Sequence, residues 1–330
     1  MSVQPRVAAR AEEVIDPHGA VVDPHHHLWD RGGECYDLAA YEAEAAAGHP
    51  VSASLYVECQ NHYLEQGPEA LRCVGETRWV VETLERAGAL GAPAVCRGLL
   101  ARADLALGAR VQEVLAQHLQ AGGSWVKGWR FCAAWDASGA IRSHYPSAPD
   151  IFERDLTSHG LDAAAGTGLA LDLWVYFHQL PAVERWLRQQ PDALIVLDHC
   201  GGPIGLGAYA GRRDEVLAEW AQGLRLFADR PRVHLKFGGL AMPLAGFGWH
   251  RWPEPPDSQT LAAAWRPYFE IALDVFGPGR MMFESNFPVD RSGCAQVTLW
   301  NAFKRLCAGL SAEERRQLLG GTASDVYRLH

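Results

Sequence analysis

The sequence predicts an α/β protein with a single domain, a TIM (β/α)8 barrel. Short apolar runs rich in Val, Ile, Leu and Trp alternate with longer segments of helical period, a pattern typical of a parallel sheet covered by helices. Eight such repeats favour a closed barrel over an open sheet. A length of 330 residues also suits one barrel, because this fold commonly runs past about 250 residues.

The eight expected strands are spread along the whole chain. They cover residues 20–25, 51–59, 94–101, 124–131, 169–178, 193–199, 232–237 and 280–287. Active sites of such barrels lie at the C-terminal ends of the strands, so the residues that close each run are the first candidates for a site.

The expected helices fill the intervals between the strands. They cover residues 68–87, 109–120, 149–165, 180–190, 212–229, 258–276 and 297–308, with a C-terminal pair at 311–319 and 322–329. Residues 1 to about 19 precede the first strand. The single domain at 1–330 therefore has an N-terminal extension and additional C-terminal helices.

Composition narrows the range of partners. The net charge is -9, no stripe of Lys and Arg is present, and no apolar run is long enough for a signal peptide or a membrane span. The eight cysteines lack C-x-x-C spacing, which indicates reduced thiols. We expect a cytoplasmic protein that binds a small molecule and neither nucleic acid nor membrane, and the sequence leaves open whether it forms a homo-oligomer.

The first strand ends in a histidine-rich segment, 23–27. Alternation of side chains along a strand puts Asp23, His25 and His27 on the side facing the barrel axis and His26 on the side facing the helices. A neutral imidazole is a common ligand for a divalent metal. One histidine alone is more often a hydrogen-bonded structural residue, but two at one strand end favour a functional site.

Two further histidines close expected strands, His178 on the fifth and His199 on the sixth. Strand ends of one barrel meet at one mouth, so these side chains are expected to converge with those of the first strand. The alternative for each is a structural histidine held by hydrogen bonds.

Strand eight carries Glu284 and Asn286 on one face. A carboxylate inside a barrel is costly unless a metal or a cation compensates it. Glu284 is therefore either a catalytic group or the partner of Lys236 or Arg130 in a structural ion pair.

Other side chains are expected to point inward and contact substrate. These are Glu58, Arg130, Trp174, Tyr176 and Lys236. The two cations suit an anionic substrate, or else they balance Glu58 and Glu284. Trp249, in a Gly-, Trp- and Pro-rich loop at 243–256, is expected to fold over the mouth.

Five segments together resemble the amidohydrolase-2 family of metal-dependent barrel hydrolases, which includes sugar lactonases and 2-pyrone-4,6-dicarboxylate lactonase. The resemblance covers residues 21–329, and its segments are VDPHHHLW at 22–29, VKGWR at 126–130, LDHCGGP at 197–203, VHLKFGG at 233–239 and MFESNFP at 282–288. It implies an amidohydrolase-type barrel with a divalent metal, zinc first and manganese second, held by His25, His27 and His178. Some members work without a metal, so metal-independent chemistry stays open.

The chain departs from this family at two positions. The resemblance places a general-base aspartate at the end of strand eight, where this chain has Asn286. An amide cannot take a proton from water, and losing a general base costs about 10² to 10⁴ in rate. Glu284, Asp290 and His199 are the candidate replacements. The arginine that dicarboxylate lactonases have after the sixth-strand histidine is also missing, since glycines occupy 201 and 202.

Three functions remain open at this point. The first is hydrolysis of a lactone, or a related ester or amide, of a small anionic or polar molecule. The second is non-oxidative decarboxylation of an aromatic or unsaturated carboxylic acid at the same site. The third is a binding protein that keeps the pocket without turnover, an alternative that Asn286 motivates.

Overall fold

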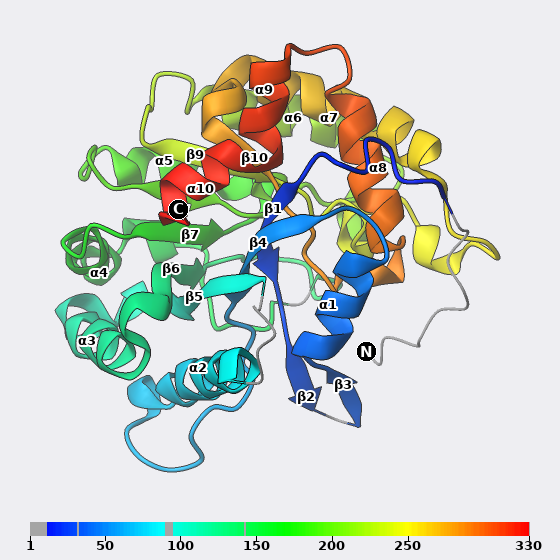
Figure 1. Ribbon diagram of the computed structural model, residues 1–330. Coiled ribbons are helices and arrows are strands. Elements are labelled where there is room, and N and C mark those ends of the chain that lie inside the picture. Colours follow the sequence, from blue (N-terminus) through cyan, green and yellow to red (C-terminus); the bar gives the residue numbers. More distant parts are fainter. Residues whose placement is uncertain (1–11, 32, 90–94, 142, 330) are drawn as a thin grey trace.

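The predicted barrel is confirmed by a computed structural model that describes residues 12–31, 33–89, 95–141 and 143–329 (Figure 1). Eight parallel strands form one sheet in the order β1-β4-β5-β6-β7-β8-β9-β10. Their bounds are Val21–His26, Val51–Val57, Cys96–Arg102, Val126–Cys132, Ala170–Trp174, Ile195–Leu197, Val233–Phe237 and Met281–Phe283. Each of the eight predicted runs overlaps one of these strands, and three of the strands end one residue beyond the predicted run.

The sheet nearly closes where its first and last strands meet. The backbone N–H of His27 donates to the carbonyl of Phe287 at 2.7 Å, and the N–H of Asn286 donates to the carbonyl of His25 at 2.8 Å. We call this junction the seam. It lies at the C-terminal ends of β1 and β10, the end of the barrel that carries the site.

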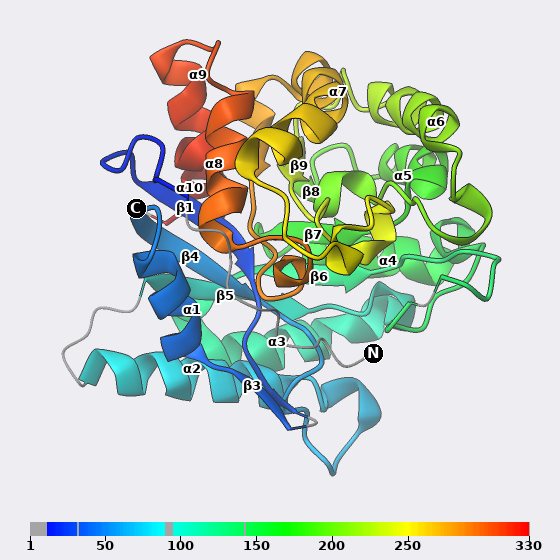
Figure 2. The ribbon, with the colours of Figure 1, turned by 90° about the vertical axis from the view of Figure 1, so that its right-hand side faces the viewer.

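Helices surround the sheet, as the two views at right angles show (Figures 1 and 2). They are α1 Leu38–Ala46, α2 Val74–Ala89, α3 Val111–Gly122, α4 Asp155–Ala165, α5 Leu180–Leu187, α6 Arg213–Arg225, α7 Ser258–Phe276, α8 Gln296–Leu306, α9 Ala312–Arg316 and α10 Thr322–Tyr327. In the part of the chain that the structure describes, no helix is long and apolar enough to cross a membrane.

Three elements between β1 and β4 were not predicted. An antiparallel hairpin joins β2 (Trp29–Arg31) to β3 (Glu34–Tyr36), and α1 follows it. The hairpin strands have three residues each, too few to show alternation, and alanines give α1 little contrast between its faces. The missed hairpin matters because it carries Trp29 and Arg31 to the barrel mouth.

The predicted end of the fifth strand was wrong. The strand β7 ends at Trp174, and His178 lies in a 3-10 helix at Phe177–Gln179. Residues Val175 and Phe177 are fully buried although they lie outside the ladder. The apolar run therefore reflects burial that continues beyond the end of the strand. A hydrophobic pattern cannot distinguish buried residues that pair in the sheet from buried residues that do not.

Alternation along β1 is also interrupted. The pairing of β1 with β4 shifts register between Asp23 and His26. As a result, Asp23 accepts a hydrogen bond from Tyr41 of α1 at 2.8 Å instead of joining the inward histidines. His26 stacks on the same tyrosine, with ring centroids 3.9 Å apart, so its predicted direction toward the helices is confirmed.

Candidate active site

A cavity of about 500 Å³ opens at the C-terminal ends of the strands. Six of the residues that line it come from five different strand ends or the turns after them: His27, Arg130, Trp174, Tyr176, His199 and Asn286. All six were predicted site residues, and Asn286 is also the position where the chain departs from the family pattern.

Three histidines gather at the base of this cavity, and we call them the histidine cluster: His25, His27 and His199. The ring of His25 lies 4.5 Å from that of His199 and 4.9 Å from that of His27, measured between centroids. These rings were predicted to lie at one mouth, and in the structure they are in contact.

Glu284 lies between two members of the cluster. Its Oε1 accepts hydrogen bonds from Nδ1 of His199 at 2.7 Å and from the backbone N–H of His199 at 3.0 Å. Its Oε2 lies 2.8 Å from Nδ1 of His25. Burial alone would raise the pKa of Glu284, but the two imidazoles hold it well below its usual value. Its predicted alternative, an ion pair with Lys236 or Arg130, is not what the structure shows.

The partners of Nδ1 fix the tautomers of two cluster histidines. His27 Nδ1 lies 2.8 Å from the carbonyl oxygen of Val57, and His199 Nδ1 faces Glu284. Both partners can only accept, so Nδ1 carries the proton and Nε2 keeps its lone pair. Burial lowers the pKa of His27 well below its usual value, which keeps this ring neutral. Histidines that bind metals typically hold a hydrogen-bond acceptor on the ring nitrogen that does not contact the metal.

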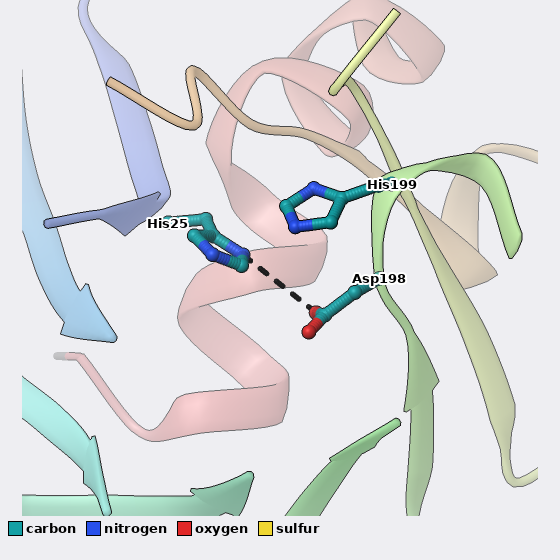
Figure 3. Close-up of side chains that lie close together, drawn as sticks. All are labelled: His25, Asp198 and His199. Atoms are coloured by element: carbon teal, nitrogen blue, oxygen red, sulfur yellow. Dashed lines mark ion pairs between the residues drawn. The ribbon is translucent and has the colours of Figure 1, made fainter. Parts of the chain in front are cut away.

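Asp198 is a site residue that sequence analysis did not assign a role. Figure 3 shows its carboxylate directed at His25 and beside His199, and donor atoms of these three residues lie within 4.8 Å of one another. Burial would raise the pKa of Asp198, but Lys236, His25 and Arg130 hold it well below its usual value. Its position beside His199, at the end of a buried run, was the available signal.

Unpartnered polar atoms in this region leave room for a cation. Two buried carboxylates, Asp198 and Glu284, face two buried cations, Lys236 and Arg130, while burial raises the pKa of Asp172 well above its usual value. Among the described residues, His25 Nε2 and both oxygens of Asp198 lack a hydrogen-bond partner. These buried unsatisfied atoms fit a bound cation.

The structure does not bring two of the predicted residues into the site. His178 Nε2 pairs with Asp136 at 3.1 Å, and its ring stacks on Tyr209. The early end of β7 puts this histidine beyond the mouth, away from the cluster. Trp249 packs against Phe247 at 4.4 Å between ring centroids and is buried instead of covering the cavity.

Two predicted substrate contacts lie behind the cavity wall. Lys236 is fully buried and bonds Asp172 at 2.5 Å and the carbonyl of Pro24 at 2.9 Å. The carboxylate of Glu58 accepts hydrogen bonds from Tyr63 and, at 2.8 Å, from Tyr145. Inward orientation was predicted for both, but depth within the barrel cannot be read from alternation alone.

Backbone strain and two glycines accompany the site. His199 and Asn286 have φ angles of 50° and 54°, in the left-handed region that non-glycine residues seldom occupy. Such strain persists where the surroundings impose it and often marks a functional position. A Cβ at Gly239 would lie 2.6 Å from Cβ of His199, and one at Gly238 would lie 2.4 Å from Cγ of Glu284. Only glycine permits this close packing.

Asp290 lies behind Asn286. One of its oxygens accepts from the side-chain amide of Asn286 at 2.5 Å, and the other accepts from the backbone N–H of Ala241 at 2.7 Å. Burial raises the pKa of Asp290 to about 7, although both hydrogen bonds act in the opposite direction.

Replacing Asp290 with asparagine is expected to remove a pH dependence of stability. Since burial raises the pKa of Asp290 from 3.8 to about 7, the folded protein holds a proton in this range that the unfolded chain has lost. The free energy of unfolding should therefore fall as pH rises, by at most about 1.4 kcal/mol per pH unit. Urea unfolding of both proteins between about pH 4 and about pH 7 measures the difference, and parallel profiles would contradict it.

Comparison with known proteins agrees with this geometry. The family model of the amidohydrolases designated Amidohydro_2 matches residues 22–329. The chain belongs to this family. This amidohydrolase is therefore an enzyme of the hydrolase type, built on the barrel that its family members share.

Two individual relatives share about a third or less of their aligned residues with this chain. Protein y4mH of Sinorhizobium fredii is 27% identical over 325 residues, covering 94% of this chain and 99% of the relative. L-fucono-1,5-lactonase of Burkholderia multivorans is 34% identical over 159 residues, covering 48% of this chain and 51% of the lactonase. The match to the lactonase thus spans about half the length of each protein.

Solved structures confirm the fold. An amidohydrolase from Burkholderia multivorans, crystallised with bound zinc, superposes with a TM-score of 0.70 at 23% identity and covers 94% of this chain and 100% of its own. At this level of identity the likeness establishes the barrel and its topology.

Proposed function

We propose that this amidohydrolase hydrolyses a lactone of a small polar molecule. The observation that carries the proposal is a cavity at the barrel mouth in which a histidine cluster with fixed tautomers lies beside the guanidinium of Arg130. The partial match to L-fucono-1,5-lactonase supports a lactone over other esters and amides. The size of the cavity, about 500 Å³, suits a small molecule.

A divalent ion fits the donors present. Asp198 and His25 would hold it together with His27, which leaves the lone pair on Nε2 of His199 free. Donor atoms of Asp198 and His25 converge, and some of them lack a partner among the described residues. Such an ion supplies Lewis-acid polarisation of a carbonyl oxygen. Zinc is the first candidate because imidazole and carboxylate are its usual ligands and a structural relative contains it.

His199 is the residue that we assign to proton transfer. Asp198 and Glu284 are held too acidic to take a proton near neutral pH, and Asp290 lies behind the cavity wall. His199 lines the cavity and keeps a lone pair on Nε2 because Glu284 occupies Nδ1. It can take a proton from the attacking water and return it to the ring oxygen when the acyl carbon–oxygen bond breaks.

Arg130 is positioned to bind the carbonyl side of the substrate. Its Nη1 donates to the backbone carbonyl of Glu58 at 2.6 Å, and its Nε lies 3.5 Å from Asp198, which fixes the plane of the guanidinium. A guanidinium held on both sides presents its remaining N–H groups in one direction. It would bind the negative charge that develops as the lactone opens.

A screen of lactones with and without added zinc or manganese tests the proposal. We expect the native enzyme to hydrolyse a hydroxylated 1,5-lactone such as L-fucono-1,5-lactone. His25→Ala and His27→Ala should each lower this turnover by about 10²-fold or more and should lose the bound metal. His159→Ala, at an exposed position on α4, is the matched control. Unchanged activity and metal content in both variants, or carbon dioxide release from aromatic acids without lactone opening, would refute it.

A further inference from the structure

Asn286 ends in a buried oxygen that has no partner in the described part of the chain. The residue is 1% exposed and lines the cavity, and its Oδ1 lacks a hydrogen-bond partner among the described residues. Leaving a buried carbonyl oxygen unpaired costs free energy, so such an atom in a cavity wall points to a ligand that supplies the missing donor.

The orientation of this amide is fixed from behind. The Nδ2 group of Asn286 donates to Oδ2 of Asp290 at 2.5 Å, and Oδ1 of Asp290 is occupied by the N–H of Ala241 at 2.7 Å. Above the pKa of Asp290, which is about 7, the carboxylate is ionised and only accepts, so it binds the NH2 side of the amide and leaves the oxygen toward the cavity. The seam bond from Asn286 N–H to the carbonyl of His25 holds the backbone in place.

We infer that Asn286 is a specificity-determining residue that accepts a hydrogen bond from a hydroxyl group of the substrate, and that Asp290 is the residue that positions it. The inference rests on the proposed function for its substrate, a lactone. It adds that this substrate carries a hydroxyl group at the point that faces Asn286. A substrate without a hydroxyl at this point would leave Oδ1 buried and unpaired, and sites built to bind a hydroxyl discriminate strongly against analogues that lack it.

Asp290→Asn is the sharpest variant because it should reverse the amide. Ala241 N–H still requires an acceptor, so Oδ1 of the new asparagine takes that bond and its NH2 group faces residue 286. Asn286 must then accept with its own oxygen and turn its NH2 group toward the cavity. Side-chain volume is nearly unchanged, while the polarity that the substrate meets is inverted.

The experiment compares hydrolysis of L-fucono-1,5-lactone with that of unsubstituted δ-valerolactone at about pH 8, where Asp290 is largely ionised. We expect Asp290→Asn and Asn286→Leu to lower kcat/KM for the hydroxylated lactone by about tenfold more than kcat/KM for δ-valerolactone, mainly through KM. Equal losses for both lactones, or no loss for either, would overturn the inference.

A binding measurement keeps this test separate from that of the proposed function. If the native enzyme opens no lactone, the proposed function fails, and thermal stabilisation by L-fuconate then tests Asn286 directly. Stabilisation of the native protein that is lost in Asn286→Leu would support the inference. Stabilisation that is equal in both proteins, or absent from the native protein, would overturn it.

Discussion

Replacing Glu284 with glutamine is expected to lower metal affinity by about 10-fold to 100-fold and turnover by a similar factor. The carboxylate accepts from His199 twice and contacts Nδ1 of His25 with its other oxygen. A glutamine has one accepting oxygen and one donating NH2 group, so it cannot serve both rings in their present tautomers. Metal content and lactone turnover of the purified variant measure the effect.

A positioning role can be separated from a structural one by comparing kcat with KM. If Glu284 holds the ring of His199 in place for proton transfer, its loss should lower kcat and leave KM little changed. Glu113→Gln, on the exposed face of α3, is the matched control. Full metal content with native turnover in Glu284→Gln would show that the bridge between the two imidazoles is dispensable.

Replacing Lys236 with methionine is expected to reduce the free energy of unfolding by about 3 to 5 kcal/mol. The ammonium group is fully buried between Asp172 at 2.5 Å and Asp198 at 3.7 Å. Methionine fills a similar volume, so the loss comes mainly from carboxylates left without their cation. Urea unfolding of the two proteins under identical conditions measures it.

The double variant Lys236→Met with Asp172→Asn shows whether charge is the cause. An asparagine at 172 can still accept the hydrogen bond that Tyr327 donates at 2.7 Å, while it removes a buried carboxylate whose pKa burial raises and Lys236 lowers. Part of the lost stability should therefore return. A double variant that is less stable than Lys236→Met would mean that packing, and not charge, explains the single variant.

The barrel could be predicted because its signal is distributed over the whole chain. Eight apolar runs with helical segments between them determine the topology even when each boundary is displaced by a few residues. The β2–β3 hairpin could not be predicted because its strands are too short to carry a period. Elements this short depend mainly on tertiary contacts, which the local sequence does not reveal.

The site was predictable to the extent that it follows strand ends. His25, His27 and His199 lie at such ends, and the structure brings them together. His178 also closes an apolar run, but its strand stops four residues earlier. Asp198 was not predicted because the register and depth that place it in one cluster with His199 depend on contacts between strands.

The seam ties barrel architecture to reactivity. The same two peptide groups that complete the cylinder carry His25 and Asn286, one at the centre of the imidazole cluster and the other on the cavity wall. Opening of the seam would displace a candidate metal ligand and a substrate-binding amide simultaneously. Mutations that destabilise β10, even far from the cavity, should therefore lower the rate of hydrolysis and the affinity for substrate together.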